Sequence, residues 1–197
     1  PAPRAELVPG IMDTRVQAVQ ACRSYLTGLG LHEMMNYSLV SPELLDLFDS
    51  NDPSGRIELP HPISAEQSIL RTSLIPQAIQ SLGTNHSRQC SEAALYETGR
   101  TFRREDGRTV EQESLSMAIM GPLGRSPLDR LRPVCDEEIF LWLKGMLEAL
   151  MDGMNRDGVS FRPGQAAWSP EGQCLEIIMD GAAVGIIGNV RAEIRQY

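Results

Sequence analysis

Residues 93–119, AALYETGRTFRREDGRTVEQESLSMAI, decide the fold. Residues 93–102 have the composition of an extended strand, and Glu105-Asp106-Gly107 supplies a turn. After the turn, apolar residues alternate with small ones, as in a strand with one buried face: Leu115, Met117 and Ile119 alternate with Ser114, Ser116 and Ala118. The pattern predicts two strands joined by a tight turn.

Helices and short strands are predicted on the N-terminal side of these strands. Apolar residues recur every three to four positions from about Asp13 to Leu29, with Asp13 or Thr14 as N-cap, which predicts a helix. An extended segment over 31–40 follows, then a helix that starts at Ser41-Pro42 and a short strand over 56–59.

Two more helix starts lie between residues 61 and 89. Ser64 with Gln67 fits a capping box, and Ser73 with Pro76 opens a helix that runs to about Leu82 and stops at Gly83.

The C-terminal part predicts one helix and one hairpin. The helix runs from Asp136, its predicted cap, to about Asp152, and the hairpin covers 174–188 around Asp180-Gly181. Strands and helices are segregated, without alternating βαβ units. The prediction is therefore an α+β fold with an antiparallel sheet flanked by helices.

Length and composition predict one domain at residues 11–197, preceded by a proline-rich linker at residues 1–10. A net charge of −8 argues against a domain that binds nucleic acid through a broad positive surface. No apolar run reaches the roughly 20 residues of a membrane span. The four cysteines are far apart, which favours free thiols in a reducing cytosol. The three histidines are scattered as well, so no metal site is predicted.

Charged residues gather at the end of the strand over 93–102. Glu97 and Arg103 fall on one face, and Arg100 and Arg104 on the other. Guanidinium groups could grip a phosphate or carboxylate there. A solvated strand end beside acidic residues is the favoured interpretation, because surface charge clusters are common.

Several ordered motifs resemble the beta subunit of bacterial phenylalanine–tRNA ligase. They cover nearly the whole chain after residue 10: NYSLVSPE at 36–43, PISAEQSILRTSLIP at 62–76, LYETGRTF at 95–102, FLWLKGMLEAL at 140–150, and residues 181–194. The resemblance implies a fold like the catalytic domain of class II aminoacyl-tRNA synthetases.

The resemblance also implies a role. In this ATP-dependent enzyme the alpha subunit charges tRNA(Phe) with phenylalanine, and the beta core is a degenerate copy that mainly builds the (αβ)₂ heterotetramer. We therefore expect a cytoplasmic assembly module that is inactive alone. Its expected partners are the alpha subunit, a second beta subunit and, in the whole enzyme, tRNA(Phe). ATP and Mg²⁺ are expected only for the whole enzyme.

The class II motifs suggest which residues matter. The first helix and the strand after it resemble the dimer-interface motif, so Val16, Val19, Leu26 and Tyr37 are interface candidates, with Tyr37 where the motif has proline. The arginines that hold ATP in motifs 2 and 3 have no clear equivalent. Arg71, Glu97 and Arg100 remain as binding candidates, and no catalytic residue is assigned.

Other functions stay open at this point. A freestanding class II-type adenylate-forming enzyme would need an arginine pair from Arg71, Arg88 and Arg100. An RNA-binding module is disfavoured by the net acidity and by an aromatic content of 5%. The exposed stripe of the first helix would allow the isolated chain to homodimerise.

Overall fold

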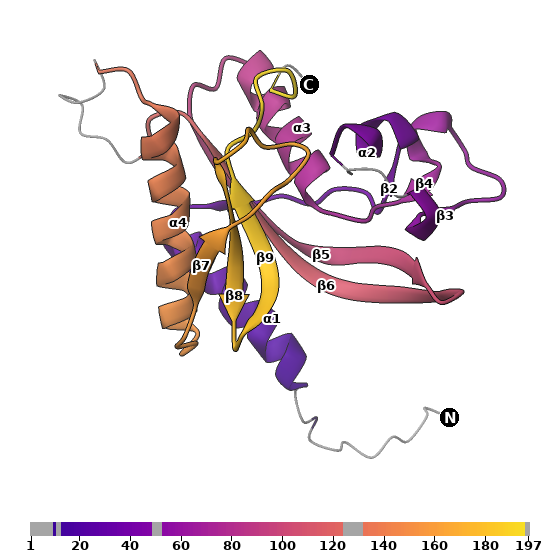
Figure 1. Ribbon diagram of the computed structural model, residues 1–197, viewed down its shortest axis with the longest axis horizontal. Coiled ribbons are helices and arrows are strands. Elements are labelled where there is room, and N and C mark those ends of the chain that lie inside the picture. The colour runs from indigo at the N-terminus through magenta and orange to yellow at the C-terminus, as the bar shows by residue number, and fades with distance from the viewer. Residues whose placement is uncertain (1–9, 11–12, 49–52, 124–131, 196–197) are drawn as a thin grey trace, which may run out of the picture.

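The computed structural model describes residues 10, 13–48, 53–123 and 132–195. Its longest elements are two paired strands, β5 (Ala93–Glu105) and β6 (Arg108–Met120), which form an antiparallel hairpin (Figure 1). Asp106 and Gly107 connect them with φ angles of 48° and 75°, as a two-residue hairpin turn requires. The short strand β1 (His32–Glu33) pairs with β5 in parallel, so the sheet order is β1-β5-β6 and the sheet is not wholly antiparallel.

Alternation along β5 sends its side chains to two layers of helices. Tyr96 packs with Leu26 of α1 (Thr14–Gly28) and Leu150 of α4 (Asp136–Gly153). Leu95, on the other face, packs against Leu82 of α3 (Ile75–Ser87). The two faces of the hairpin are therefore buried by different helices.

A smaller unit lies beside the outer part of the hairpin. It contains α2 (Pro42–Phe48), the 3₁₀ turns η1 (Pro53–Gly55) and η2 (Ala65–Gln67), and an antiparallel sheet of order β2-β4-β3. The strands are β2 (Leu39–Val40), β4 (Ile69–Leu70) and β3 (Ile57–Glu58). Trp168 and Ile194 join its core.

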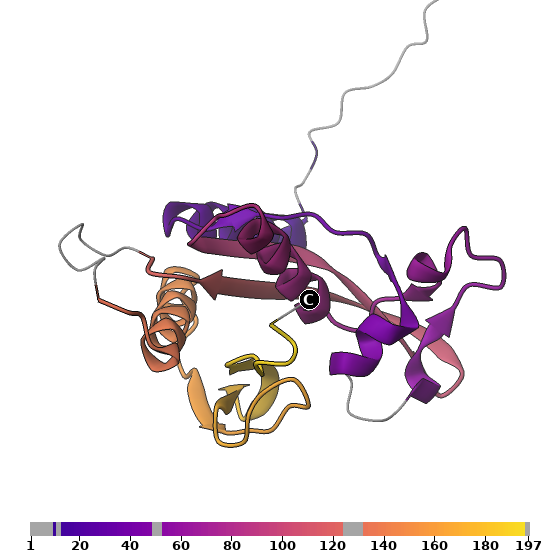
Figure 2. The same ribbon diagram turned by 90° about the horizontal axis from the view of Figure 1, so that it is seen from above.

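The third sheet has the order β7-β8-β9 and lies across the hairpin from α1 (Figure 2). Its strands are β7 (Ser160–Pro163), β8 (Cys174–Met179) and β9 (Ala182–Gly188). Asp180 and Gly181 form the β8–β9 turn with φ angles of 51° and 79°. Ile177 and Ile187 pack this sheet onto Leu147 of α4.

Most predicted elements are present. The first helix begins where expected, because the Asp13 carboxylate accepts a hydrogen bond of 2.8 Å from the Arg15 backbone N–H. The tight turns at Asp106-Gly107 and Asp180-Gly181 are also confirmed. The predicted strand over 31–40 is broken, since only its ends pair as β1 and β2.

Three helix boundaries differ from prediction. Ser64 makes no side-chain cap bond, and only the single 3₁₀ turn η2 follows it. The helix α3 continues through Gly83 to Ser87, because buried Leu82 holds this part on the sheet and outweighs the cost of about 1 kcal/mol for a helical glycine. Cys135, rather than Asp136, is the N-cap of α4, and the Asp136 carboxylate accepts hydrogen bonds from Arg195. The strand β7 was not predicted.

One predicted feature, the linker at residues 1–10, lies outside the described residues apart from Gly10. Of the helices that the structure describes, none is both long and apolar enough to cross a membrane.

Candidate functional site

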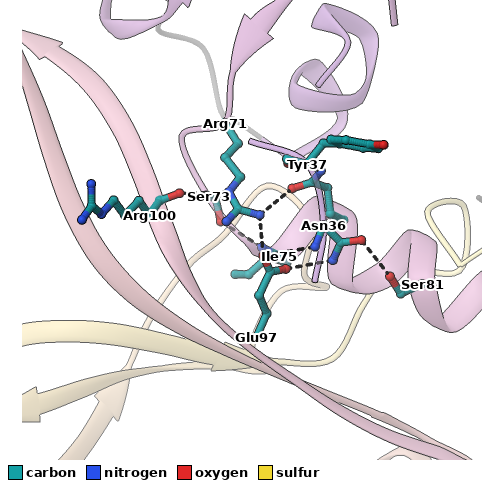
Figure 3. Close-up of polar contacts among 9 residues, drawn as sticks. Asn36, Tyr37, Arg71, Ser73, Ile75, Ser81, Glu97 and Arg100 are labelled. Carbon is teal, nitrogen blue, oxygen red and sulfur yellow. Dashed lines mark hydrogen bonds and ion pairs between the residues drawn. The ribbon is translucent and has the colours of Figure 1, made fainter. Parts of the chain in front are cut away.

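A buried ion pair links β4 to the hairpin. Arg71 directly follows β4, and Glu97 lies on the face of β5 that α3 covers. The Arg71 Nη1 atom is 2.6 Å from Glu97 Oε1, and each side chain is only 4% exposed. Figure 3 shows the two groups meeting between strand and helix. Both charges are removed from water, so each depends on its partners for stabilisation.

Neighbouring groups satisfy most of the remaining polar atoms of the pair. Arg71 donates from Nε to the Arg100 carbonyl at 2.9 Å and from Nη1 to Gln77 Oε1 at 3.1 Å. Glu97 Oε2 accepts from Asn36 Nδ2 at 2.8 Å. Gly99 leaves the space for the guanidinium, because a Cβ atom there would overlap Arg71 Nη2. Arg71 and Glu97 therefore neutralise each other within a closed network.

The third binding candidate is not part of this network through its side chain. The Arg100 guanidinium points to solvent and pairs with Glu111 at 3.1 Å, with both side chains more than half exposed. The structure thus brings Arg71 and Glu97 together and leaves the Arg100 side chain outside.

A cleft of about 820 Å³ lies between β6 and β9, with α3 and α4 contributing to its walls. Sequence reasoning did not find it, because it depends on how the two sheets are placed. Both strands are edge strands of their sheets in the described part of the chain. One end carries small polar side chains, among them Thr101, Ser114 and Ser116. Ser116 is 6% exposed and its hydroxyl has no hydrogen-bond partner.

The charged side chains of this cleft are already paired. Arg195, the only arginine among the described lining residues, holds both carboxylate oxygens of Asp136 at 3.1 and 2.6 Å. This bond keeps the pKa of the Asp136 carboxyl below its ordinary value. Glu113 is bound by Arg15 at 2.8 Å. The cleft therefore offers no described guanidinium that is free for a phosphate, and its residues do not fit ATP with Mg²⁺.

No group of three or more histidine, cysteine, aspartate or glutamate side chains that could hold a metal ion occurs among the residues described.

The interface candidates differ in their exposure. Leu26 is fully buried in the core of its own chain, so it cannot be part of a contact surface. Val16 is 46% exposed and Val19 is half-buried on α1. Tyr37 is 73% exposed, and Met35, which sequence reasoning did not select, is 88% exposed. The structure leaves Val16, Tyr37 and Met35 open to contact.

The architecture defines the class of fold. It matches PylSc, a pyrrolysyl tRNA synthetase of Desulfitobacterium hafniense, with a TM-score of 0.69 and 13% identity, over 92% of this chain and 60% of that chain. A second pyrrolysyl-tRNA synthetase structure from the same organism gives 0.62 and 12%, over 85% and 56%. The chain therefore has the α+β fold of a class II synthetase catalytic domain, as the resemblance implied.

The sequence comparisons define the family. The family model of the phenylalanyl tRNA synthetase beta chain CLM domain matches residues 2–196, so this chain belongs to that family. The chain is 33% identical over 179 residues to the phenylalanine–tRNA ligase beta subunit of Bacillus subtilis, covering 88% of this chain and 22% of that protein. The Geobacillus kaustophilus beta subunit is 29% identical over 197 residues, with 98% and 24% covered. The chain spans about a quarter or less of these relatives.

Proposed function

We propose that this chain is a non-catalytic assembly module of phenylalanine–tRNA ligase, the (αβ)₂ enzyme that charges tRNA(Phe) with phenylalanine. The proposal rests on membership of the beta chain family together with a class II fold. The alpha subunit and a second beta subunit are the proposed partners, and the cytoplasm is the proposed location. In this proposal, the alpha subunit binds ATP and Mg²⁺.

The main support for the non-catalytic role is that Arg71 and Arg195 are paired with carboxylates of the same chain. Adenylate formation places negative charge on phosphate oxygens, and a catalyst must offer free cationic groups where this charge develops. Arg71 is buried against Glu97, and Arg195 is bound through two nitrogens to Asp136. The chain therefore has a class II fold in which Arg71 and Arg195 bind carboxylates of the same chain, and this supports a role without catalysis.

The exposed positions support the assembly role. The helix α1 has 15 residues, yet Leu26 is its only buried one. A surface helix normally buries a wide apolar stripe. Val16, Val19 and Tyr37 are the proposed contact residues for another subunit.

ATP–pyrophosphate exchange with phenylalanine tests the absence of catalysis. We expect no exchange above the blank for this chain alone. In the complete enzyme, Arg195→Ala and Ser114→Ala are expected to leave the kcat of exchange unchanged. Robust exchange by the isolated chain would contradict the proposal and favour a freestanding adenylate-forming enzyme. A tenfold loss of kcat in either variant, with assembly intact, would contradict the non-catalytic role within the complete enzyme.

The alternative function, a freestanding adenylate-forming enzyme, predicts that the chain binds ATP. It needs Arg88 or Arg100 as a phosphate ligand, since Arg71 is buried with Glu97. A weaker affinity for ATP in Arg100→Ala, measured by calorimetry, would support that enzyme. No measurable ATP binding by the wild-type chain is the result expected for an assembly module.

A further inference from the structure

One buried hydroxyl on the wall of the cleft between β6 and β9 has no hydrogen-bond partner. Ser116 lies opposite Glu97 in the β5–β6 ladder, so it shares the face of the hairpin that α3 covers. Ser116 lines the cleft, is 6% exposed, and makes no hydrogen bond through its Oγ atom. Buried polar groups are normally paired, because an unmade hydrogen bond costs free energy. This position therefore leaves a hydrogen bond available to a ligand.

The polar side chains beside Ser116 on the two strands already have partners. Thr101 Oγ1 and Ser114 Oγ lie 3.3 Å apart and share a hydrogen bond. Glu97, the cross-strand neighbour of Ser116, is bound by Arg71 at 2.6 Å. Ser116 differs from these neighbours, because its hydroxyl can bind a ligand without breaking an existing hydrogen bond.

The charges around the cleft favour a neutral ligand. The ionisable side chains among its described lining residues are His86, Glu113, Asp136 and Arg195. Arg195 and Asp136 bind each other through two hydrogen bonds. Glu113 is bound by Arg15, and His86 is exposed to solvent. A phosphate, carboxylate or ammonium group inside the cleft would lose its hydration without meeting an unpaired opposite charge on these residues, which is costly.

Much of the remaining wall of the cleft is apolar and comes from distant parts of the chain. It includes five side chains that are each 8% exposed or less: Leu74, Ala78, Leu147, Trp168 and Ile187. The volume of about 820 Å³ lies within the range of roughly 300–1,000 Å³ that is typical of small-ligand pockets. Such walls bind the apolar body of a ligand, because contact removes its surface from water.

We propose that the cleft between β6 and β9 binds a neutral small molecule with an apolar body and one alcohol or amide group, and that Ser116 forms a hydrogen bond with this group. A serine hydroxyl both donates and accepts, so it suits alcohols and amides. Its Oγ atom can turn between staggered positions about the Cα–Cβ bond to meet the ligand. This binding site goes beyond the proposed assembly function and involves no catalytic step.

The test uses the complete beta subunit and three compounds with the same naphthalene body, and equilibrium dialysis at neutral pH measures each Kd. Naphthalenemethanol carries an alcohol, methylnaphthalene carries no polar group, and naphthoate carries a carboxylate. We expect a Kd of about 1 mM or below for naphthalenemethanol. Naphthoate should bind at least about tenfold more weakly, because burial of its charge is not compensated in the described part of the cleft.

Two serine variants locate the site. Ser116→Ala removes the hydroxyl and is expected to weaken binding of naphthalenemethanol about fivefold, while methylnaphthalene should bind as tightly as before or more tightly. Ser160→Ala, on the exposed strand β7 outside the cleft, is the matched control and should keep both wild-type Kd values. Without ligand, Ser116→Ala should not lower the urea midpoint of unfolding, because the hydroxyl that it removes is unpaired.

Each contrary result overturns a different statement. A Kd clearly above about 1 mM for naphthalenemethanol overturns the binding site and leaves the assembly function standing. Equal effects of Ser116→Ala on the two neutral compounds overturn the role of its hydroxyl. Binding of naphthoate as tight as that of naphthalenemethanol overturns the neutral class of ligand. A lower urea midpoint in Ser116→Ala means that the hydroxyl is already bonded, for instance to a water molecule, and overturns its availability to a ligand.

Discussion

Breaking the buried ion pair should cost far more stability than breaking an exposed one. In Glu97→Gln the side chain keeps its shape but loses its charge, which leaves the Arg71 guanidinium buried without a counterion. The charges are 2.6 Å apart and each side chain is 4% exposed. At an effective dielectric of about 20 their attraction is about 6 kcal/mol, and desolvation of both ions offsets much of it. Removing one partner leaves the other charge buried, so we expect a loss of about 3–5 kcal/mol.

The chain offers a matched control for this substitution. Glu111 pairs with Arg100 on the same hairpin, but the two side chains are 51% and 60% exposed. Glu111→Gln should therefore cost less than about 1 kcal/mol. The double variant Arg71→Met/Glu97→Leu removes both charges, and we expect it to be more stable than Glu97→Gln by about 2 kcal/mol.

Urea unfolding followed by circular dichroism measures all three variants. The slope of free energy against urea concentration should stay constant, so that a shifted midpoint reports stability. If Glu97→Gln and Glu111→Gln differ by less than about 1 kcal/mol, the conclusion that burial decides the cost is refuted. A double variant less stable than Glu97→Gln would contradict the view that the unpaired charge is the main penalty.

Three further predictions concern single sites. Gly99→Ala should lower the free energy of unfolding, measured in urea, by about 1–3 kcal/mol, because the new methyl group overlaps a guanidinium that is already buried. Asp136→Asn should cost about 0.5–1 kcal/mol at pH 7. Because folding lowers the pKa of this carboxyl from 3.8, its stabilisation is present above that pH and disappears as the pH falls through the lower folded value, so the curves of stability against pH for variant and wild type should merge in acid. Exposed Cys90 should react with a thiol reagent at pH 8 at least about tenfold faster than Cys22, whose pKa is raised by burial; equal rates by mass spectrometry would contradict this.

Local chemistry made several elements predictable. Asp-Gly at 106–107 and 180–181 adopts positive φ angles readily, so the two hairpin turns follow from short-range preference. Asp13 caps the first helix through its own carboxylate. Tertiary contacts explain where the third helix ends, because buried Leu82 holds α3 on the sheet and the helix continues past Gly83. The Asp136 carboxylate, predicted as a helix cap, instead accepts from Arg195.

In the candidate site, too, the residue types could be recognised from the sequence, whereas their contacts depend on the tertiary structure. Arg71 and Glu97 were recognised from their chemistry and from the family resemblance, but their pairing was not, since 26 positions separate them along the chain. The extended segment predicted over 31–40 did not reveal that only its ends pair as strands and that Met35 is exposed. The cleft between β6 and β9 depends on the placement of two sheets with no contiguous sequence pattern.

By itself, the sequence determined the α+β class, most turns and helices, and the family, because these depend on local preferences and on ordered motifs. Only the tertiary structure decided whether the candidate arginines were available to bind an anion. Arg71 appeared in the sequence as a candidate ligand for an anion, and folding places a carboxylate of the same chain 2.6 Å away. A charge acts on a ligand only if its own neighbours leave it unpaired, and those neighbours come from distant parts of the chain.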